Sequence, residues 1–391
     1  MEEAAATKPE LEDLLRREIA AKGGIPFARF MEQALYHPRY GYYTSERVRI
    51  GKKGDFFTSS SVHYAFGQLI ARQLEQMWRL LGEGDFVIAE QGAGEGHLAL
   101  DILDSLQRDY PEFYRQVRYR IVEISEDNIR RQKSNLSRHT DLGRIGWCAL
   151  NELGGMRGCF LSNELLDAFP VHLVQQVGGQ LREVYVVNGD AGFSEELRKP
   201  STPALAEYFQ RLGITLLEGN RAEVNLAACR WLDDVAAVLE RGFVMTIDYG
   251  YPAEELYAPA RHAGTLLCYF RHQTNEDFYC RPGCQDMTAH VDFTTLQHEG
   301  RRLGLEPVYY GRQYQFLMGL GFFELLLQLQ EGETDPRRAQ ALRMSLKRLI
   351  LPEEGMGENF KVLIQSKGVE PCELLCARRI KDISTLLPGL V

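Results

Sequence analysis

Phe86-Val-Ile-Ala-Glu90-Gln-Gly92-Ala-Gly94-Glu-Gly96 is a short apolar run that ends in a glycine-rich loop. Across residues 98–106, apolar side chains then recur at helical spacing. The pattern predicts a buried strand, a tight turn and a helix. Glycine suits such a turn because it adopts positive φ values and lets the backbone approach a ligand closely.

The same order of a strand followed by a helix recurs along the chain. Tyr119-Arg-Ile-Val-Glu123 predicts a second strand, and the polar stretch 126–138 predicts the helix that follows it. Further strands are predicted at residues 145–150, 159–162, 243–248 and 360–365. Strands that alternate with helices favour an α/β fold with a parallel sheet covered on both faces, and with ligands at the carboxyl ends of the strands.

Two interruptions of this pattern predict a second structural unit. Residues 172–177 and 181–187 alternate around Gly178-Gly179, which is typical of a β-hairpin. We therefore expect insertions at 172–226 and 251–312 that form an α+β substrate subdomain. The expected core comprises residues 82–171, 227–250 and 313–391, and residues 1–81 are expected to be a helical region that covers the ligand face.

The composition limits the classes of partner. The chain has 391 residues, with 45 Lys and Arg against 54 Asp and Glu, so its formal charge is −9. This acidic balance disfavours a nucleic-acid partner, because phosphate neutralisation needs a concentrated basic surface. No segment has the roughly 20 apolar residues of a membrane-spanning helix. We expect no nucleic acid and no membrane span, and a homodimer is a candidate assembly.

The eight cysteines indicate reduced thiols, because they are too sparse for a disulfide scaffold. The pairs Cys280/Cys284 and Cys372/Cys376 lack the usual spacing of zinc ligands, so no metal is expected. Acidic residues near the start argue against a mitochondrial transit peptide, and no secretory signal is visible. The expected location is the cytoplasm.

The glycine-rich loop is the candidate cofactor site. A dinucleotide fingerprint would read GxGxxG, but His97 stands where its last glycine is required. An acid two residues before a GxGxG loop instead resembles motif I of class I S-adenosylmethionine-dependent methyltransferases. The strand-end acid Glu123 resembles the residue that receives the cofactor ribose in those enzymes. The alternative is a glycine-rich turn that only connects a strand to a helix.

This resemblance implies S-adenosyl-L-methionine as the cofactor and a Rossmann-like class I methyltransferase sheet as the fold. The residues expected to line the cofactor are Gly92, Gly94, Gly96 and Glu123, with Glu90 and Asp55 in support.

The rest of the chain resembles one branch of these enzymes, the MidA family, which includes the mitochondrial complex I assembly factor that methylates arginine. The resemblance covers nearly the whole chain. Besides motif I, its marks are FMEQALYHPRYGYY at 30–43, GDFFTS at 54–59, SNELLDAFPV at 162–171, IDYG at 247–250 and QDMTAHVDF at 285–293. One departure is Ser60-Ser61, where the family usually has Pro-Glu, so a role of that glutamate does not carry over.

Asn163-Glu164-Leu-Leu-Asp167 follows the fourth predicted strand, on the cofactor side of the sheet. The i, i+3 spacing of Glu164 and Asp167 fits one helical face, and the two carboxylates are candidates to orient the methyl acceptor. The alternative is that they only favour the N-terminus of the following helix through its dipole. Asp248 and Tyr249, which follow the fifth strand, are expected in the same pocket.

Two further groups have structural interpretations that we favour. In the polar cluster of Gln285, Asp286, His290 and Asp292, His290 could act as a base near neutral pH, but a hydrogen-bonded loop lock is the favoured interpretation. An aromatic stripe could bind substrate, but packing of the first helices against the core is favoured. This stripe consists of Tyr36, His37, Tyr40, Tyr42 and Tyr43.

The resemblance implies a methyltransferase that modifies arginine nitrogen on a protein, with a subunit of respiratory complex I or an analogue as the partner. Two alternatives stay open: a small-molecule methyltransferase with the same cofactor pocket, and a non-catalytic assembly factor that retains the fold only to bind a partner. A nicotinamide-dependent oxidoreductase is disfavoured by His97.

Overall fold

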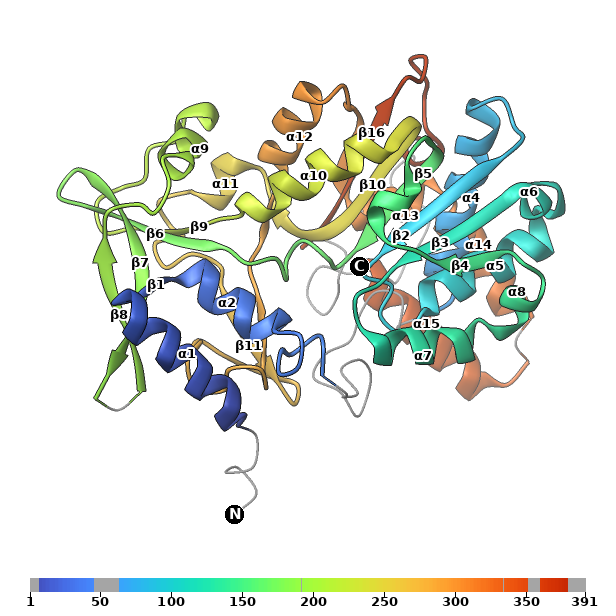
Figure 1. The fold of residues 1–391 in the computed structure, drawn as a ribbon. Helices are drawn as coiled ribbons and strands as arrows, with labels where there is room; N and C mark the ends of the chain where they lie inside the picture. The colour runs from blue at the N-terminus through green and yellow to red at the C-terminus, as the bar shows by residue number, and fades with distance from the viewer. Residues whose placement is uncertain (1–6, 46–62, 191, 333, 351–358, 379–391) are drawn as a thin grey trace.

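The computed structural model describes residues 7–45, 63–190, 192–332, 334–350 and 359–378, so Asp55 and Ser60-Ser61 lie outside the described residues. The described chain forms sheets of eight, five and three strands. Figure 1 shows the eight-stranded sheet and its helices on one side of the molecule. The five-stranded sheet lies on the other side, together with α1 (Pro9–Lys22) and α2 (Phe27–Tyr36).

The eight-stranded sheet is the core of the fold. Its strands are β2 (Phe86–Gln91), β3 (Val117–Val122), β4 (Ile145–Trp147), β5 (Met156–Asn163), β10 (Leu239–Tyr251), β14 (Val291–Asp292), β15 (Glu306–Arg312) and β16 (Phe360–Lys367). The order is β15-β16-β10-β5-β2-β3-β4, and β14 pairs with β10. The strands β2 to β5 and β10 run parallel, while β16 is antiparallel to both neighbours. The predicted α/β class and the six predicted core strands are confirmed.

Apolar clusters cover both faces of this sheet. Phe86 and Ile88 belong to one cluster and Ala89 to the other, because side chains alternate along a strand. The first cluster is completed by α4 (Ala65–Leu80), α5 (His97–Asp109), α6 (Pro111–Gln116), α13 (Gln313–Gly319), α14 (Phe322–Glu331), α15 (Pro336–Ile350) and η3 (Leu375–Ala377). The second contains α10 (Leu226–Val238), α12 (Phe293–Arg302) and η2 (Leu150–Leu153). After β3 the chain forms α7 (Glu126–Asn135) and α8 (Ser137–Asp141).

The five-stranded sheet is built mainly from the first predicted insertion. It contains β1 (Ile25–Pro26), β6 (His172–Val177), β7 (Gln180–Gly189), β8 (Gly192–Arg198) and β9 (Arg221–Val224), and α9 (Ala204–Leu212) follows β8. The strands β6 and β7 pair antiparallel around Gly178 and Gly179, whose φ values are 59° and 72°. The predicted hairpin is therefore confirmed. The helices α1 and α2 share an apolar cluster with Val184 and Val186 of β7.

The structure divides the chain at different points from those expected. Within the range 251–312, α11 (Ala253–Leu256) and the small sheet of β11 (Leu267–Phe270), β12 (Gln273–Asn275) and β13 (Asp286–Thr288) lie outside the core sheet. In contrast, β14, α12 and β15 are part of the core, since β14 pairs with β10 and β15 with β16. These strands escaped the sequence pattern because β14 has two residues and β15 contains Pro307 and Gly311.

The N-terminal region is also divided. The helix α4 packs on α5 within the core cluster, whereas α1 and α2 pack against the inserted sheet. Within the described residues, no helix combines the length and the apolar character that crossing a bilayer requires.

Candidate functional site

A pocket opens at the carboxyl ends of β2, β3, β5 and β10, with a cavity volume of about 200 Å³. Its walls come from the glycine loop, from residues 122–124 and 163–169, and from side chains outside the core sheet. Each charged residue in the described lining is an acid: Glu90, Glu95, Glu123, Glu164, Asp167 and Asp286. Such a lining favours a cationic ligand, because opposite charge stabilises buried carboxylates.

The glycine loop has the conformation that its sequence predicts. Gly92, Gly94 and Gly96 have φ values of 76°, 55° and 84°, which L-residues with side chains rarely adopt. Gly92 and Gly94 line the pocket. Gly96 is not among the lining residues; it is the N-cap residue of α5, and a Cβ atom there would lie 2.9 Å from Cδ1 of Leu136.

Glu123 directly follows β3 and lines the pocket. Its Oε1 accepts hydrogen bonds from the backbone N–H groups of Ile124 and Ser125, each at 2.8 Å. Its Oε2 accepts from the side-chain amides of Asn128 at 3.2 Å and Gln132 at 3.1 Å. These four contacts fix the carboxylate at the pocket wall.

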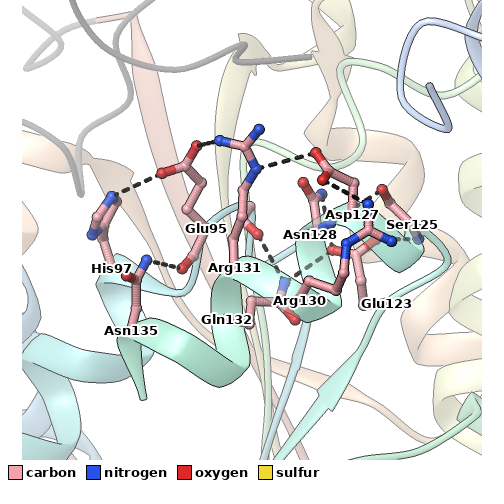
Figure 2. Close-up of polar contacts among 11 residues, drawn as sticks. Glu95, His97, Glu123, Ser125, Asp127, Asn128, Arg130, Arg131, Gln132 and Asn135 are labelled. Carbon is pink, nitrogen blue, oxygen red and sulfur yellow. Dashed lines mark hydrogen bonds and ion pairs between the residues drawn. The ribbon is translucent and has the colours of Figure 1, made fainter. Parts of the chain in front are cut away.

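The helix α7 connects Glu123 to the glycine loop (Figure 2). Gln132 Nε2 also donates to the carbonyl of Gly94 at 2.8 Å, and Arg131 forms an ion pair with Glu95 at 3.1 Å. Asn135 donates to the carbonyl of Glu95 at 2.9 Å. These contacts were not predicted, because in the sequence this helix is marked only by its polar residues. The i, i+3 and i+4 spacing of Asn128, Arg131 and Gln132 is the signal that could have indicated one functional face.

Ile124 is a second residue that the sequence analysis missed. It follows Glu123 directly, lines the pocket and is 65% exposed. Its apolar side chain is therefore accessible to a ligand in the pocket. The signal that could have indicated Ile124 is a single apolar residue between Glu123 and the polar stretch 125–128.

Glu90 lies in the floor of the pocket and is buried. Its Oε2 accepts a hydrogen bond of 2.6 Å from the hydroxyl of Tyr119. Burial raises the pKa of Glu90 to about 7, and the Tyr119 hydrogen bond opposes this shift. The structure thus places Glu90 in the pocket lining, in contact with Tyr119 of β3.

The segment after β5 is a turn and not the expected helix. Glu164 has a φ of 54°, and its N–H donates to the carbonyl of Ile247 at 2.9 Å. Asp248 Oδ2 then accepts from the N–H groups of Leu165, Leu166 and Asp167 at 3.2, 2.8 and 3.4 Å. The i, i+3 helical face was therefore wrong, because a buried carboxylate from β10 takes the place of helical hydrogen bonding, although Glu164 and Asp167 both line the pocket.

Asp248 supports this turn from behind. It is fully buried, it is not among the pocket-lining residues, and its Oδ1 accepts from the N–H of Tyr249 at 2.9 Å. Burial raises its pKa to about 7, against the lowering effect of its backbone hydrogen bonds. Tyr249, by contrast, lines the pocket.

Asp167 and Asn163 each present a buried oxygen without a hydrogen-bond partner. These atoms are Oδ1 of Asp167, which is 5% exposed, and Oδ1 of Asn163. Burial, followed by the negative charges of Asp248, Asp286 and Glu164, raises the pKa of Asp167. Buried acceptors normally find a donor, so these two atoms indicate where a ligand with N–H groups would bind.

Two tyrosines of the aromatic stripe lie in the pocket wall. The hydroxyl of Tyr36 donates to the carbonyl of Ala168 at 3.0 Å, and the hydroxyl of Tyr43 donates to Oδ1 of Asp286 at 2.8 Å. Their rings stack with centroids 5.5 Å apart. The packing interpretation is therefore incomplete for Tyr36 and Tyr43, and Asp286 is a pocket residue.

His290 and Asp292 are not among the pocket-lining residues. Burial lowers the pKa of His290 to about 4, so the interpretation as a base near neutral pH is not supported. The ring of His290 stacks on that of Tyr249 at 6.3 Å. Asp292 Oδ1 accepts from the N–H groups of Thr294 and Thr295 and so caps α12, which agrees with a loop lock.

Comparisons with known proteins identify what the chain is similar to. Residues 69–310 match the family described as "Putative S-adenosyl-L-methionine-dependent methyltransferase". A structure of a COG1565 superfamily member from Burkholderia thailandensis, bound to S-adenosyl-homocysteine, is 33% identical, with a TM-score of 0.85 and coverage of 96% of each chain.

More distant relatives carry a described activity. The protein arginine methyltransferase NDUFAF7, mitochondrial, of Homo sapiens is 27% identical over 88% of this chain and 81% of its own length. The corresponding homolog of Drosophila melanogaster is 28% identical over 91% of this chain and 84% of its own length.

Proposed function

Because the chain belongs to the family of S-adenosyl-L-methionine-dependent methyltransferases matched by residues 69–310, we propose that it methylates an arginine nitrogen on a protein. S-adenosyl-L-methionine is the cofactor. Arginine as the acceptor is supported by the activity named for the human and fly relatives, and a respiratory complex I subunit or an analogue is the partner that the MidA resemblance implies.

The residues of the pocket fit this cofactor. Gly92 and Gly94 leave the loop without side chains, so backbone can meet the methionyl portion. The Glu123 carboxylate suits the paired hydroxyls of the ribose. One hydroxyl can take the place of the Asn128 amide as a donor to Oε2 of Glu123, and Asn128 also lines the pocket. The exposed side chain of Ile124 offers an apolar surface to the adenine. Glu90 supports the loop, and Asp55 lies outside the described residues.

The acid lining addresses the chemical difficulty of arginine. Its pKa of about 12.5 to 13.8 lies some 6 units above neutral pH, so deprotonation before transfer would cost roughly 8 kcal/mol. A pocket that binds the guanidinium as a cation avoids this step. Glu164 and Asp167 would orient it, and bound cofactor supplies a methyl carbon activated by its sulfonium sulfur.

Asp167 is also suited to take up the proton that arginine loses on methylation. Its raised pKa makes it a stronger base than an ordinary carboxylate, and Oδ1 is the atom without a donor. One observation carries the arginine proposal. The Oδ1 atoms of Asp167 and Asn163 have no donor, and they lie in a lining whose described charged residues are all acids.

Calorimetry tests the cofactor half. Titration of S-adenosyl-L-methionine should give a saturable heat for the wild type and lose it for Gly94→Val, since valine cannot adopt a φ of 55° without strain. Gly213→Val is the matched control, because Gly213 has a φ of 65° at the end of α9, away from the pocket. Equal heats for the wild type and Gly94→Val would defeat the assignment.

Transfer of a labelled methyl group tests the acceptor half. The purified protein, labelled cofactor and a protein extract from a strain that lacks this gene should yield methylarginine after acid hydrolysis. Label found only in small metabolites would instead support the small-molecule alternative. Rescue of the deletion strain by Glu164→Gln, Asp167→Asn without turnover would support the scaffold alternative.

A further inference from the structure

Asp286 is a pocket acid contributed by the inserted part of the chain. It opens β13, which pairs with β11 in the three-stranded sheet, outside the core sheet. Asp286 is 2% exposed and lines the same pocket as Asp167. Hydrogen bonds to such a buried carboxylate hold it in one orientation.

Among the described residues, two donors contact Oδ1 of Asp286. The N–H of Met287 donates to Oδ1 at 2.9 Å, and the hydroxyl of Tyr43 donates to the same atom at 2.8 Å. Tyr43 follows α2 and lies 243 residues from Asp286 in sequence. The N-terminal region thus holds a carboxylate of the insertion at the wall of the pocket.

Asp167 is connected to the same wall. Its carbonyl accepts from the N–H of Ala289 at 2.9 Å, so the turn after β5 is tied to the segment that directly follows β13. The Oδ1 atom of Asp167 has no hydrogen-bond partner, although the residue is only 5% exposed. The unpartnered Oδ1 atom of Asp167 therefore marks a position where a ligand with N–H groups can donate to this wall.

The donor groups of Tyr36, Tyr43 and Asn163, which line the same pocket, already have acceptors. The hydroxyl protons of Tyr36 and Tyr43 are used in their hydrogen bonds to Ala168 and Asp286. Asn163 Nδ2 donates to Oε1 of Glu164 at 3.1 Å, which leaves its orphan Oδ1 as an acceptor. A ligand that brings several N–H donors and a positive charge matches this wall; a carboxylate or phosphate does not.

We propose that Asp286 is a second acceptor-binding carboxylate, which together with Asp167 receives the guanidinium of the substrate arginine, and that Tyr43 positions it. This inference rests on the proposed function. Since a guanidinium presents five N–H donors in a planar fork, two carboxylates from different parts of the chain discriminate it from the compact ammonium of lysine.

The test measures two quantities on each variant: the dissociation constant of S-adenosyl-L-methionine, and the initial rate of methylarginine formation in the extract from the deletion strain. Asp286→Asn should lower the rate about 10- to 100-fold, the loss expected for a hydrogen bond to a charged group, and change the cofactor constant less than two-fold. Glu276→Gln, which alters an exposed acid in the same insertion, should leave both unchanged.

Tyr43→Phe distinguishes positioning from a structural effect. The variant should lower the rate by a smaller factor, and Asp286→Asn with Tyr43→Phe should be no slower than Asp286→Asn alone, because Tyr43 acts through Asp286. If the two substitutions lower the rate by independent factors that multiply in the double variant, the positioning role of Tyr43 is overturned. If Asp286→Asn loses cofactor binding, the Tyr43→Phe variant tests the inference instead, because it retains the carboxylate of Asp286. Reduced methyl transfer with normal cofactor binding in Tyr43→Phe supports the inference.

Failure of this inference differs from failure of the proposed function. Methylarginine formed at the wild-type rate by Asp286→Asn would overturn the role of Asp286 and leave the arginine activity in place. A wild-type protein that binds the cofactor and forms no methylarginine would overturn both.

Discussion

Glu90 is a carboxyl group held in an environment that favours its neutral form. It is 2% exposed beneath the glycine loop, and burial raises its pKa from 4.5 to about 7. Since the folded value lies above the unfolded one, the stability contributed by protonation is complete below about pH 4.5 and is lost as the pH rises through about 7.

Replacing Glu90 with glutamine should therefore have an effect that depends on pH. Glutamine has no charge to bury and keeps an acceptor for Tyr119. Relative to the wild type, the free energy of unfolding of Glu90→Gln should rise from pH 5 to pH 8, by at most about 3 kcal/mol for a shift of this size. Urea unfolding at pH 5, 6.5 and 8 measures this difference, with exposed Glu112→Gln as the control. Parallel profiles for Glu90→Gln and wild type would contradict it.

The site residues that could be predicted are those whose role depends on the local chain. The glycines have positive φ because a strand must turn directly into a helix, and Glu123 lies where its strand ends. Tyr43 and Asp286 could not be predicted as a pair, because their hydrogen bond joins residues 243 positions apart. Their separate patterns, an aromatic stripe and a polar loop, each have a sufficient packing explanation.

At the scale of elements, α7 is a support for the cofactor site. Its residues Asn128, Arg131, Gln132 and Asn135 share one side of the helix and reach either Glu123 or the glycine loop (Figure 2). Gln132 reaches both, and its Oε1 accepts from the indole N–H of Trp147 at 2.7 Å. Gln132 therefore connects the loop that follows β2 with the residue that follows β3.

Loss of the Gln132 amide should weaken cofactor binding. Gln132→Ala removes the donor to Glu123 and the donor to the carbonyl of Gly94, so we expect the dissociation constant of S-adenosyl-L-methionine to rise about 5- to 30-fold, on the scale of one or two net hydrogen bonds. Calorimetry on Gln132→Ala and on Ser134→Ala, an exposed position of the same helix, checks this. Similar constants for the two variants would show that the amide contributes nothing.

The turn after β5 depends on Asp248, a residue of another strand. Asp248→Ala leaves the N–H groups of Leu165, Leu166 and Tyr249 without their acceptor, and should lower the free energy of unfolding by about 3 kcal/mol or more. Asp248→Asn keeps an acceptor oxygen and should lose less. Urea unfolding of both variants tests this, with exposed Asp141→Ala as the reference; a loss for alanine no larger than that for asparagine would contradict it.

A helix was predicted after β5 because the acid spacing of residues 164–167 is compatible with one. The competing factor is the tertiary contact with Asp248, which no local pattern contains. The helix predicted at 126–138 begins at Glu126 as expected, because the N-cap residue Ser125 accepts from the N–H of Asn128, a contact encoded within four residues; it ends earlier, at Asn135. Local chemistry predicts elements well, and contacts between strands override it.

At the scale of the whole molecule, the proposed cofactor half of the pocket belongs to the core, and the proposed acceptor half combines core, insertion and N-terminal residues. Ligand binding to the folded state alone should stabilise the entire chain. At 100 times its dissociation constant, S-adenosyl-homocysteine should add about 2.7 kcal/mol to the unfolding free energy of the wild type and of Asp286→Asn, and nothing for Gly94→Val. Thermal unfolding with and without ligand measures this; a shift for Gly94→Val equal to that of the wild type would contradict it.

The fold class could be predicted because strands and helices alternate with clear periods over the central chain. The exact limits of the insertions could not, because the strands β14 and β15 return to the core sheet without the apolar run that marks β2 or β5. Pairing with an established neighbour, rather than intrinsic preference, forms such short strands.

The hydrogen bond between the N–H of Ala289 and the carbonyl of Asp167 has a consequence for biosynthesis. A ribosome delivers the glycine loop and Glu123 within the first third of the chain, but Asp286 and Ala289 emerge only after almost three quarters of it. A nascent polypeptide therefore carries the residues for its methyl donor long before it carries the last of those proposed for its target. Any chain released before residue 286 lacks Asp286 and Thr288 of the pocket lining.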